Sequence, residues 1–257
     1  MIQFLLKLIL THIIGDFVLQ PSKWVNDKNA HSFKSKYLYY HIVVHSLLLL
    51  LFLNFNYIIA IIFIILSHLI IDIVKIEYNK RHKQYQRISF FIDQILHLLI
   101  LFAITFIYFP NECIIIFKKI PSTKILLITT CLIFVTNVAA VVIKQIMSHW
   151  HIEDNLSENS LKNAGKYIGM LERLLIFFFI ITNQPASVGF LVAAKSIFRF
   201  NDLSKDKDRK LTEYILIGTL LSFSIALIIS WCYLYIEKYI FGELTENLKF
   251  RLFSRNQ

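Results

Sequence analysis

The chain contains little cysteine. Cys113, Cys131 and Cys232 are scattered over 257 positions and lie in or near apolar runs. They form no CxxC pair and give no disulfide framework, so we interpret them as small buried hydrophobic residues. The sequence also lacks low-complexity segments, and no small-residue cleavage site follows its first apolar run. We therefore expect residues 1–19 to be a retained membrane span rather than a removed signal peptide.

Apolar residues dominate the composition, at 56% of the chain, and the mean hydropathy is +0.60. Ordinary soluble domains carry less apolar content, and a membrane-spanning helix needs roughly 20 mostly apolar residues. The sequence therefore predicts an all-α, polytopic transmembrane helical bundle with seven or eight membrane segments. The apolar segments are 1–19, 38–53, 57–74, 88–109, 123–147, 168–182 and 211–236, with a shorter stretch at 186–198 that is a tight span or a re-entrant helix.

The net charge of +10 comes from basic residues that fall mainly between the apolar segments. In a soluble protein this charge would suggest a nucleic-acid partner, but here membrane topology explains it better, and we expect no nucleic acid. Residues 20–37 and 75–87 are rich in lysine and arginine, whereas the connection at 54–57 carries no charge. The positive-inside rule places both basic segments in the cytoplasm and the N-terminus outside, in a multi-pass protein of the cell membrane.

The apolar pattern divides the chain into three regions. Residues 1–110 form a four-span bundle of two hairpins that carries histidine and aspartate pairs. Residues 111–167 contain a connector, the fifth span and a polar loop. Residues 168–257 form a second membrane block and a C-terminal tail.

Four polar pairs recur in the first four spans, one pair in each. Every pair has the spacing i, i+4, which places both side chains on one face of a helix. The first and third pairs lie near the C-terminal ends of their spans, and the second and fourth lie near N-terminal starts. Antiparallel packing therefore brings all four pairs to one side of the membrane, which the charge pattern identifies as the cytoplasmic side. The pairs are His12 and Asp16, His41 and His45, His68 and Asp72, and Asp93 and His97.

Five histidines and three aspartates at one level of a helical bundle predict a metal site. Imidazole and carboxylate suit zinc, our first expectation, and also manganese or iron. Helical bundles build dinuclear sites from such pairs. Eight groups exceed the need of one tetrahedral ion, so either two ions or one ion with outer partners would account for them. The expected ligands are His12, Asp16, His41, His45, His68, Asp72 and His97, with Asp93 as a ligand or a general base.

Three alternatives stand beside the metal site. The pairs could hydrogen-bond one another and hold the bundle together, form a proton relay in a transporter, or lie solvated at the interface. Four pairs at matched depth favour the metal site. Among the neighbours, we expect Gly15 to let the chain pack closely beside the first pair. Lys75 could pair with Asp72, but we expect it to reach the headgroups.

Charged residues in the second block also gather on the cytoplasmic side by the hairpin argument. Arg173 follows Glu172 near the start of one span, and Lys195 and Arg199 end the next segment. Arginine matches phosphate geometry, so we predict that Arg173, Lys195 and Arg199 bind an anionic substrate group. Internal salt bridges with Glu172 or Glu213 are an equally good interpretation.

The runs HIIGDFVLQPSKW, HIVVH, HLIIDIVK and FIDQILH, taken in order, resemble the bacterial membrane family called "domain of unknown function 3307" over residues 1–110. The second block, with YIGMLERLL, GFLVAAKSIFRF and EYILIGTLLS, looks like the C-terminal part of longer members. More remotely, the histidine–aspartate spans are similar to membrane-bound metal-dependent hydrolases. The resemblance implies a protein of the bacterial inner membrane and leaves the reaction open.

These observations favour a membrane-embedded metal-dependent hydrolase that faces the cytoplasm. A bound metal lowers the pKa of water to roughly 7 and supplies hydroxide. The site lies near the headgroups of the membrane lipids, so an amphiphilic phosphate, such as a lipid or isoprenoid phosphate, is the expected substrate. One alternative is a transporter or channel for protons or metal ions that uses the same cluster. Another is a membrane-anchored module that recruits a partner through 20–37, 75–87 and 148–167.

Overall fold

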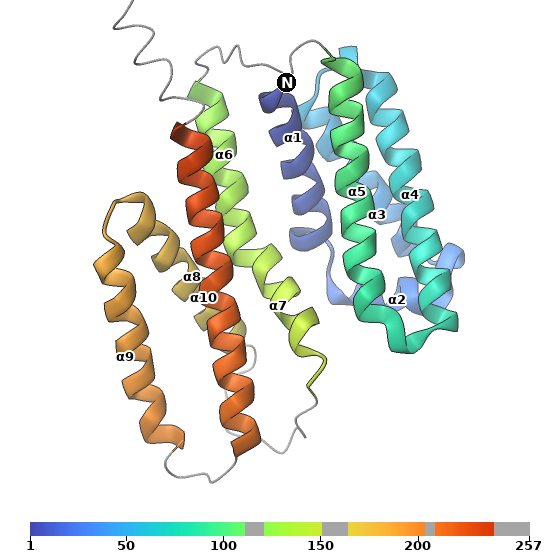
Figure 1. The fold of residues 1–257 in the computed structure, drawn as a ribbon. Coiled ribbons are helices and arrows are strands. Elements are labelled where there is room, and N and C mark those ends of the chain that lie inside the picture. Colours follow the sequence, from blue (N-terminus) through green and yellow to red (C-terminus); the bar gives the residue numbers. More distant parts are fainter. Residues whose placement is uncertain (111–120, 151–163, 204–208, 239–257) are drawn as a thin grey trace, which may run out of the picture. The chain divides into compact units, whose positions relative to one another are not determined.

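The computed structural model describes residues 1–110, 121–150, 164–203 and 209–238. Within these ranges every regular element is a helix, which confirms the predicted all-α class (Figure 1). The chain forms two compact units, Met1–Thr130 and Cys131–Gln257, called unit 1 and unit 2 below. The histidine and aspartate pairs all lie in unit 1.

Unit 1 is a bundle of four helices, α1, α3, α4 and α5, with the short helix α2 lying across one end (Figure 1). The chain turns by 84° between η1 and α2, where Pro21 precedes the first turn of α2. At the start of α3, the Ser35 hydroxyl accepts a hydrogen bond from Tyr37 N at 3.2 Å and so caps the helix. The elements are α1 (Ile2–Ile13), η1 (Ile14–Val18), α2 (Ser22–His31), η2 (Ser32–Lys34), α3 (Lys36–Phe52), η3 (Phe55–Tyr57), α4 (Ile58–Arg81), η4 (Lys83–Tyr85) and α5 (Gln86–Tyr108).

The end of the bundle away from α2 is filled by an apolar core. Phe4 packs its ring against Tyr57 and Phe109, with ring centroids 4.9 and 5.3 Å apart. Outward-facing positions are also apolar, and Leu51 and Ile59 are 78% and 75% exposed, as a lipid-facing surface requires. The bundle therefore has an apolar end, an apolar exterior and one polar end. The core residues, called the apolar core below, are Phe4, Leu8, Leu49, Leu53, Ala60, Ile61, Ile64, Leu101 and Ile104.

Unit 2 is also helical, and α6 runs across the boundary between the units. Its core lies between α8, α9 and α10 and includes Ile176, Phe223 and Ala226. Cys131 is buried as expected, and Cys113 lies outside the described residues. The expectation is wrong for Cys232, which is exposed. The elements are α6 (Pro121–Ile133), η5 (Phe134–Val138), α7 (Ala139–Met147), α8 (Ala164–Ile181), α9 (Pro185–Leu203) and α10 (Arg209–Glu237).

The expected count of seven or eight spans is not supported. Among the described residues, four helices are long and apolar enough to cross a membrane, or five if the bent pair α1–η1 and α2 counts as one span. The shortfall has physical causes, because α3 has only 17 residues and α8 carries Lys166, Glu172 and Arg173. The candidate spans are 55–81, 83–108, 122–147 and 210–237.

Candidate metal centre

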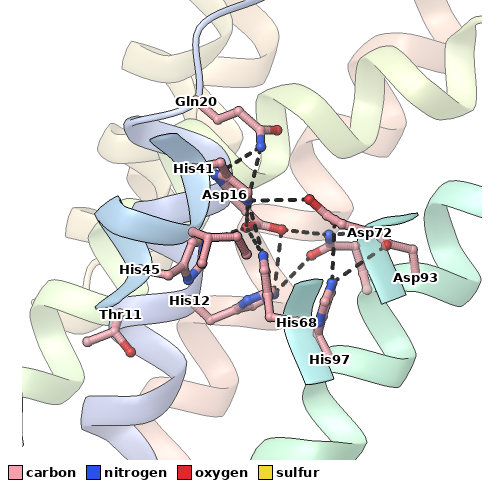
Figure 2. Close-up of polar contacts among 12 residues, drawn as sticks. Thr11, His12, Asp16, Gln20, His41, His45, His68, Asp72, Asp93 and His97 are labelled. Carbon is pink, nitrogen blue, oxygen red and sulfur yellow. Dashed lines mark hydrogen bonds and ion pairs between the residues drawn. The ribbon is translucent and has the colours of Figure 1, made fainter. Parts of the chain in front are cut away.

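The structure brings all four pairs together in unit 1 (Figure 2), at the end that α2 covers (Figure 1). The pairs lie on α1 and η1, on α3, on α4 and on α5, so four separate helices contribute. Asp16 has a side chain that is 9% exposed, and the other seven residues are buried. The convergence expected from the sequence is therefore present. The buried residues are His12, His41, His45, His68, Asp72, Asp93 and His97.

Three imidazoles surround one carboxylate oxygen of Asp16. Asp16 Oδ1 lies 3.0 Å from His45 Nε2, 3.3 Å from His41 Nε2 and 3.6 Å from His68 Nε2. His41 Nε2 and His68 Nε2 are themselves 3.1 Å apart. His12 Nε2 approaches the other oxygen, Asp16 Oδ2, at 3.9 Å. We call these five residues the Asp16 ring.

The backbone of η1 and the glycine within it shape this ring. Residues 14–18 form a π-helical turn, in which Leu19 N donates to Ile14 O at 2.9 Å, and such turns are frequent at functional sites. Gly15 lies within this turn and is buried. A Cβ atom at Gly15 would lie 2.3 Å from His45 Nε2, so only glycine lets the imidazole reach Asp16. The close packing expected at Gly15 is confirmed.

A second group contains Asp72, Asp93 and His97, called the triad below. His97 Nε2 lies 3.5 Å from Asp93 Oδ1 and 3.9 Å from Asp72 Oδ1. Within the described part of the chain, His97 Nε2 and Asp93 Oδ1 are buried without a hydrogen-bond partner. Buried polar atoms normally have hydrogen-bond partners, so these two atoms have the capacity to bind a further ligand.

Two lysines bind the carboxylates of the triad, and the sequence analysis missed this role for both. Lys28, on α2, is buried and places Nζ 2.9 Å from Asp72 Oδ2. Lys75, on α4, places Nζ 2.6 Å from Asp93 Oδ2. The expectation that Lys75 reaches the headgroups is wrong, because its side chain crosses to the carboxylate on α5. The role of Lys28 could not be predicted, because it lies in a polar segment and the sequence does not indicate that α2 folds back over the site.

Two glutamines complete the network. Gln94 Nε2 donates to Asp16 Oδ2 at 3.0 Å and to Asp93 Oδ2 at 3.1 Å, and so links the Asp16 ring to the triad. Its Oε1 lies 3.3 Å from His12 Nε2. Gln20 places Nε2 3.1 Å from the ring nitrogens of His41. Gln94 lies in the run DQILH. A polar amide within an apolar segment, next to Asp93, was the feature of the sequence that could have identified it.

A cavity of about 10 Å³ lies between the cluster and the apolar core. A single water needs roughly 10–15 Å³ by this measure, so the space suits one water or ion. The lining includes His12, His45, His68 and His97 on one side and Leu8 of the apolar core on the other. The polar site therefore ends at this cavity, against tightly packed aliphatic side chains.

The spacing of the ligand atoms fits a metal ion. Ligands about 2.0–2.1 Å from zinc in a tetrahedron lie roughly 3.3 Å from one another. The nitrogen and oxygen separations in the Asp16 ring and the triad are close to this length. The groups whose ligand atoms all lie within 4.8 Å of one another are His12, Asp16, His45 and His68; His41, His68 and Asp72; and Asp72, Asp93 and His97.

Two of the three residues predicted to bind an anionic group, Lys195 and Arg173, make contacts within unit 2. Lys195 Nζ lies 2.6 Å from Glu172 Oε2, the salt bridge that was the alternative to anion binding. Arg173 is buried and donates to Val135 O at 2.5 Å, Thr136 O at 3.2 Å and Ser222 Oγ at 3.0 Å. The side chain of Arg199 lies outside the described residues. Anion binding by these three residues stays a prediction.

Residues 4–126 match the family model described as "Protein of unknown function (DUF3307)". This segment of the chain belongs to that family. The matched segment contains all eight residues of the cluster, together with Lys28, Lys75 and Gln94. No curated protein and no solved structure matches the chain. The remoter likeness to metal-dependent hydrolases stays a prediction.

Proposed function

We propose that this chain is a membrane-embedded metal-dependent hydrolase whose cluster holds a divalent transition metal ion, with zinc as the first candidate. The observation that carries the proposal is the buried triad, in which His97 Nε2 and Asp93 Oδ1 lie 3.5 Å apart and neither has a hydrogen-bond partner among the described residues. Imidazole and carboxylate together are the ligand set of zinc, manganese and iron enzymes. A bound ion would satisfy both atoms.

The proposed placement puts unit 1 in the cell membrane with α1, α3, α4 and α5 all embedded and the N-terminus outside. The apolar exterior of these helices supports embedding, although α1 and α3 are short for a full span. Helix α2 then lies along the cytoplasmic interface, where Trp24 stacks on Tyr37 with ring centroids 5.7 Å apart. Aromatic residues are enriched at that depth. The cluster lies just above α2, within reach of lipid headgroups.

The proposed reaction is hydrolysis of an amphiphilic phosphate ester, such as a lipid or isoprenoid phosphate. Water oxygen bonds to phosphorus, the bond from phosphorus to the alcohol oxygen breaks, and one proton passes from water to the departing alcohol. A metal in the cluster would supply hydroxide at neutral pH. Of the two roles predicted for Asp93, ligand or general base, this placement favours ligand, because Oδ1 faces the proposed ion and Oδ2 accepts from Lys75 and Gln94. A histidine of the Asp16 ring would then accept the proton from water, and Gln94 holds the carboxylates of Asp16 and Asp93 in position.

A transporter that uses the same groups is the competing hypothesis. It needs a polar route to the opposite side of the membrane. In unit 1 the route ends at the apolar core, where Leu8, Leu49 and Ile61 are 0%, 1% and 2% exposed. This arrangement supports a site that is open to one side only, as an enzyme requires.

The test uses the whole chain, purified and reconstituted in liposomes. We expect wild-type protein to retain zinc, manganese or iron and to release phosphate from a panel of lipid and isoprenoid phosphates. Asp72→Asn should lose the metal and the activity together, whereas Asp27→Asn, outside the cluster, should keep both. Failure of folded wild-type protein to bind metal would overturn the proposal. Flux of protons or metal ions across the liposomes, without turnover of the panel, would favour the transporter.

A further inference from the structure

The carboxylates of Asp72 and Asp93 each divide their two oxygens in the same way. Asp72 Oδ2 accepts from Lys28, and Asp93 Oδ2 accepts from Lys75. The Oδ1 atoms of both residues face His97 Nε2, at 3.9 and 3.5 Å (Figure 2). Each carboxylate therefore has one oxygen held by an ammonium group and one directed toward a common point.

Two of the three atoms at that common point lack a hydrogen-bond partner in the part of the chain that the structure describes, whereas the Asp16 ring is hydrogen-bonded. His97 and Asp93 are 3% and 2% exposed, and His97 Nε2 and Asp93 Oδ1 accept or donate no hydrogen bond among the described residues. Leaving a buried polar atom unpaired is costly. In the Asp16 ring, by contrast, His45 Nε2 contacts Asp16 Oδ1 at 3.0 Å, and Gln94 donates to Asp16 Oδ2.

The atoms of the ring already contact one another. Asp16 Oδ1 lies 3.0–3.6 Å from the Nε2 atoms of His41, His45 and His68, and the Nε2 atoms of His41 and His68 are 3.1 Å apart. An ion that bound there would have to replace these hydrogen bonds. In the triad, an ion would enter among atoms that are already directed at it.

Charge limits the number of ions. Three aspartates and two lysines give the cluster a charge of −1 when its histidines are neutral, as metal ligands must be. One divalent cation changes this charge to +1, and two would change it to +3. Uncompensated charge within a membrane is expensive. Lys28 and Lys75 thus supply the positive charge that a second ion would supply in a dinuclear site.

We propose that the cluster takes a single divalent cation, bound by Asp72, Asp93 and His97, with Lys28 and Lys75 holding the carboxylates from outside and the Asp16 ring as a neighbouring hydrogen-bonded group. This inference rests on the proposed metal site and deepens it. It selects one ion with outer partners over two ions, and it divides the eight predicted residues into three ligands and five neighbours.

The test compares two buried histidines of the same cluster, His97 and His45, with zinc alone as the probe. Wild-type protein in detergent should bind one zinc per chain by elemental analysis and by titration. His97→Ala should weaken binding by more than the roughly 10- to 100-fold that loss of an outer partner costs, and His45→Ala by no more than that. Size-exclusion profiles and helix content establish that each variant is folded.

A second pair of variants covers the case in which the alanine variants do not fold. His97→Cys loaded with cobalt(II) should show a thiolate-to-cobalt charge-transfer band, and His45→Cys should not. Two zinc ions per chain, or the band in His45→Cys alone, would overturn the single triad site while leaving the metal-dependent function standing. Absence of bound metal in folded wild-type protein would overturn both.

Discussion

The imidazole ring of His45 lies directly against the Cα atom of Gly15. A Cβ built at Gly15 would be 2.3 Å from Nε2 and 2.5 Å from Cε1 of that ring. Because the contact involves the ring rather than a flexible chain end, any side chain at position 15 must move His45 away from Asp16. This contact joins α3 to the π-helical turn that presents the first carboxylate.

Gly15→Ala should therefore destabilise the protein by about 1–3 kcal/mol, the usual cost of overpacking a buried site. The measurement is denaturant or thermal unfolding in detergent. Gly189→Ala is the matched control, because nothing lies within 4 Å of a Cβ built at Gly189 on α9. That change should leave stability equal or slightly higher, since alanine favours helix by about 0.5–1 kcal/mol. Equal stability of the two variants would show that His45 is not fixed as described.

The Lys75–Asp93 pair offers a second prediction. The Lys75 side chain is 24% exposed, but Asp93 is buried. Removal of the lysine leaves this buried carboxylate uncompensated, so Lys75→Met should cost about 3 kcal/mol, the lower end of the range for buried pairs. Lys80→Met breaks an exposed pair with Glu77, at 3.7 Å on the same helix, and should cost no more than about 1 kcal/mol. Unfolding measurements on both variants check this. A small effect of Lys75→Met would mean that the lysine does not stay on Asp93.

Arg173 gives a third prediction, in unit 2. It donates to the carbonyls of Val135 and Thr136, two residues of the π-helical segment η5. Arg173→Met leaves the buried carbonyl of Val135 and the half-buried carbonyl of Thr136 without their donor and should cost about 1–3 kcal/mol. Lys166→Met, at an exposed position on the same helix α8, should change stability by no more than about 0.5 kcal/mol. If Arg173→Met instead kept full stability and lost phosphate binding, the anion-binding prediction would be favoured.

The cluster could be predicted from the sequence because its geometry follows from two local rules. The i, i+4 spacing fixes the face of each pair, and the alternation between span ends and span starts fixes their common depth. The convergence of one histidine from each helix could therefore be predicted without knowledge of the tertiary contacts, and the structure places these residues together: His12, His41, His68 and His97. The close approach at Gly15 was also readable, because a glycine beside buried polar groups marks a tight contact.

The roles of the lysines and the number of spans depended on tertiary structure. Lys28 follows the chain's exit from the bundle, and only the 84° turn of the chain at Pro21 brings α2 back beneath the site. Lys75 lies three residues from Asp72, but its direction across the helix interface selects Asp93 instead. The π-helical turns could not be predicted either, because they are defined by backbone hydrogen bonds and the spacing of apolar residues does not reveal them.

Metal content tests the central claim most directly. Wild-type protein purified in detergent is exposed in turn to zinc, manganese and iron(II), freed of unbound metal and measured by elemental analysis beside folded Asp72→Asn. We predict one tightly held ion per wild-type chain for at least one of these metals, and none in the variant. A folded, monodisperse wild-type chain that retains none of the three would contradict the account.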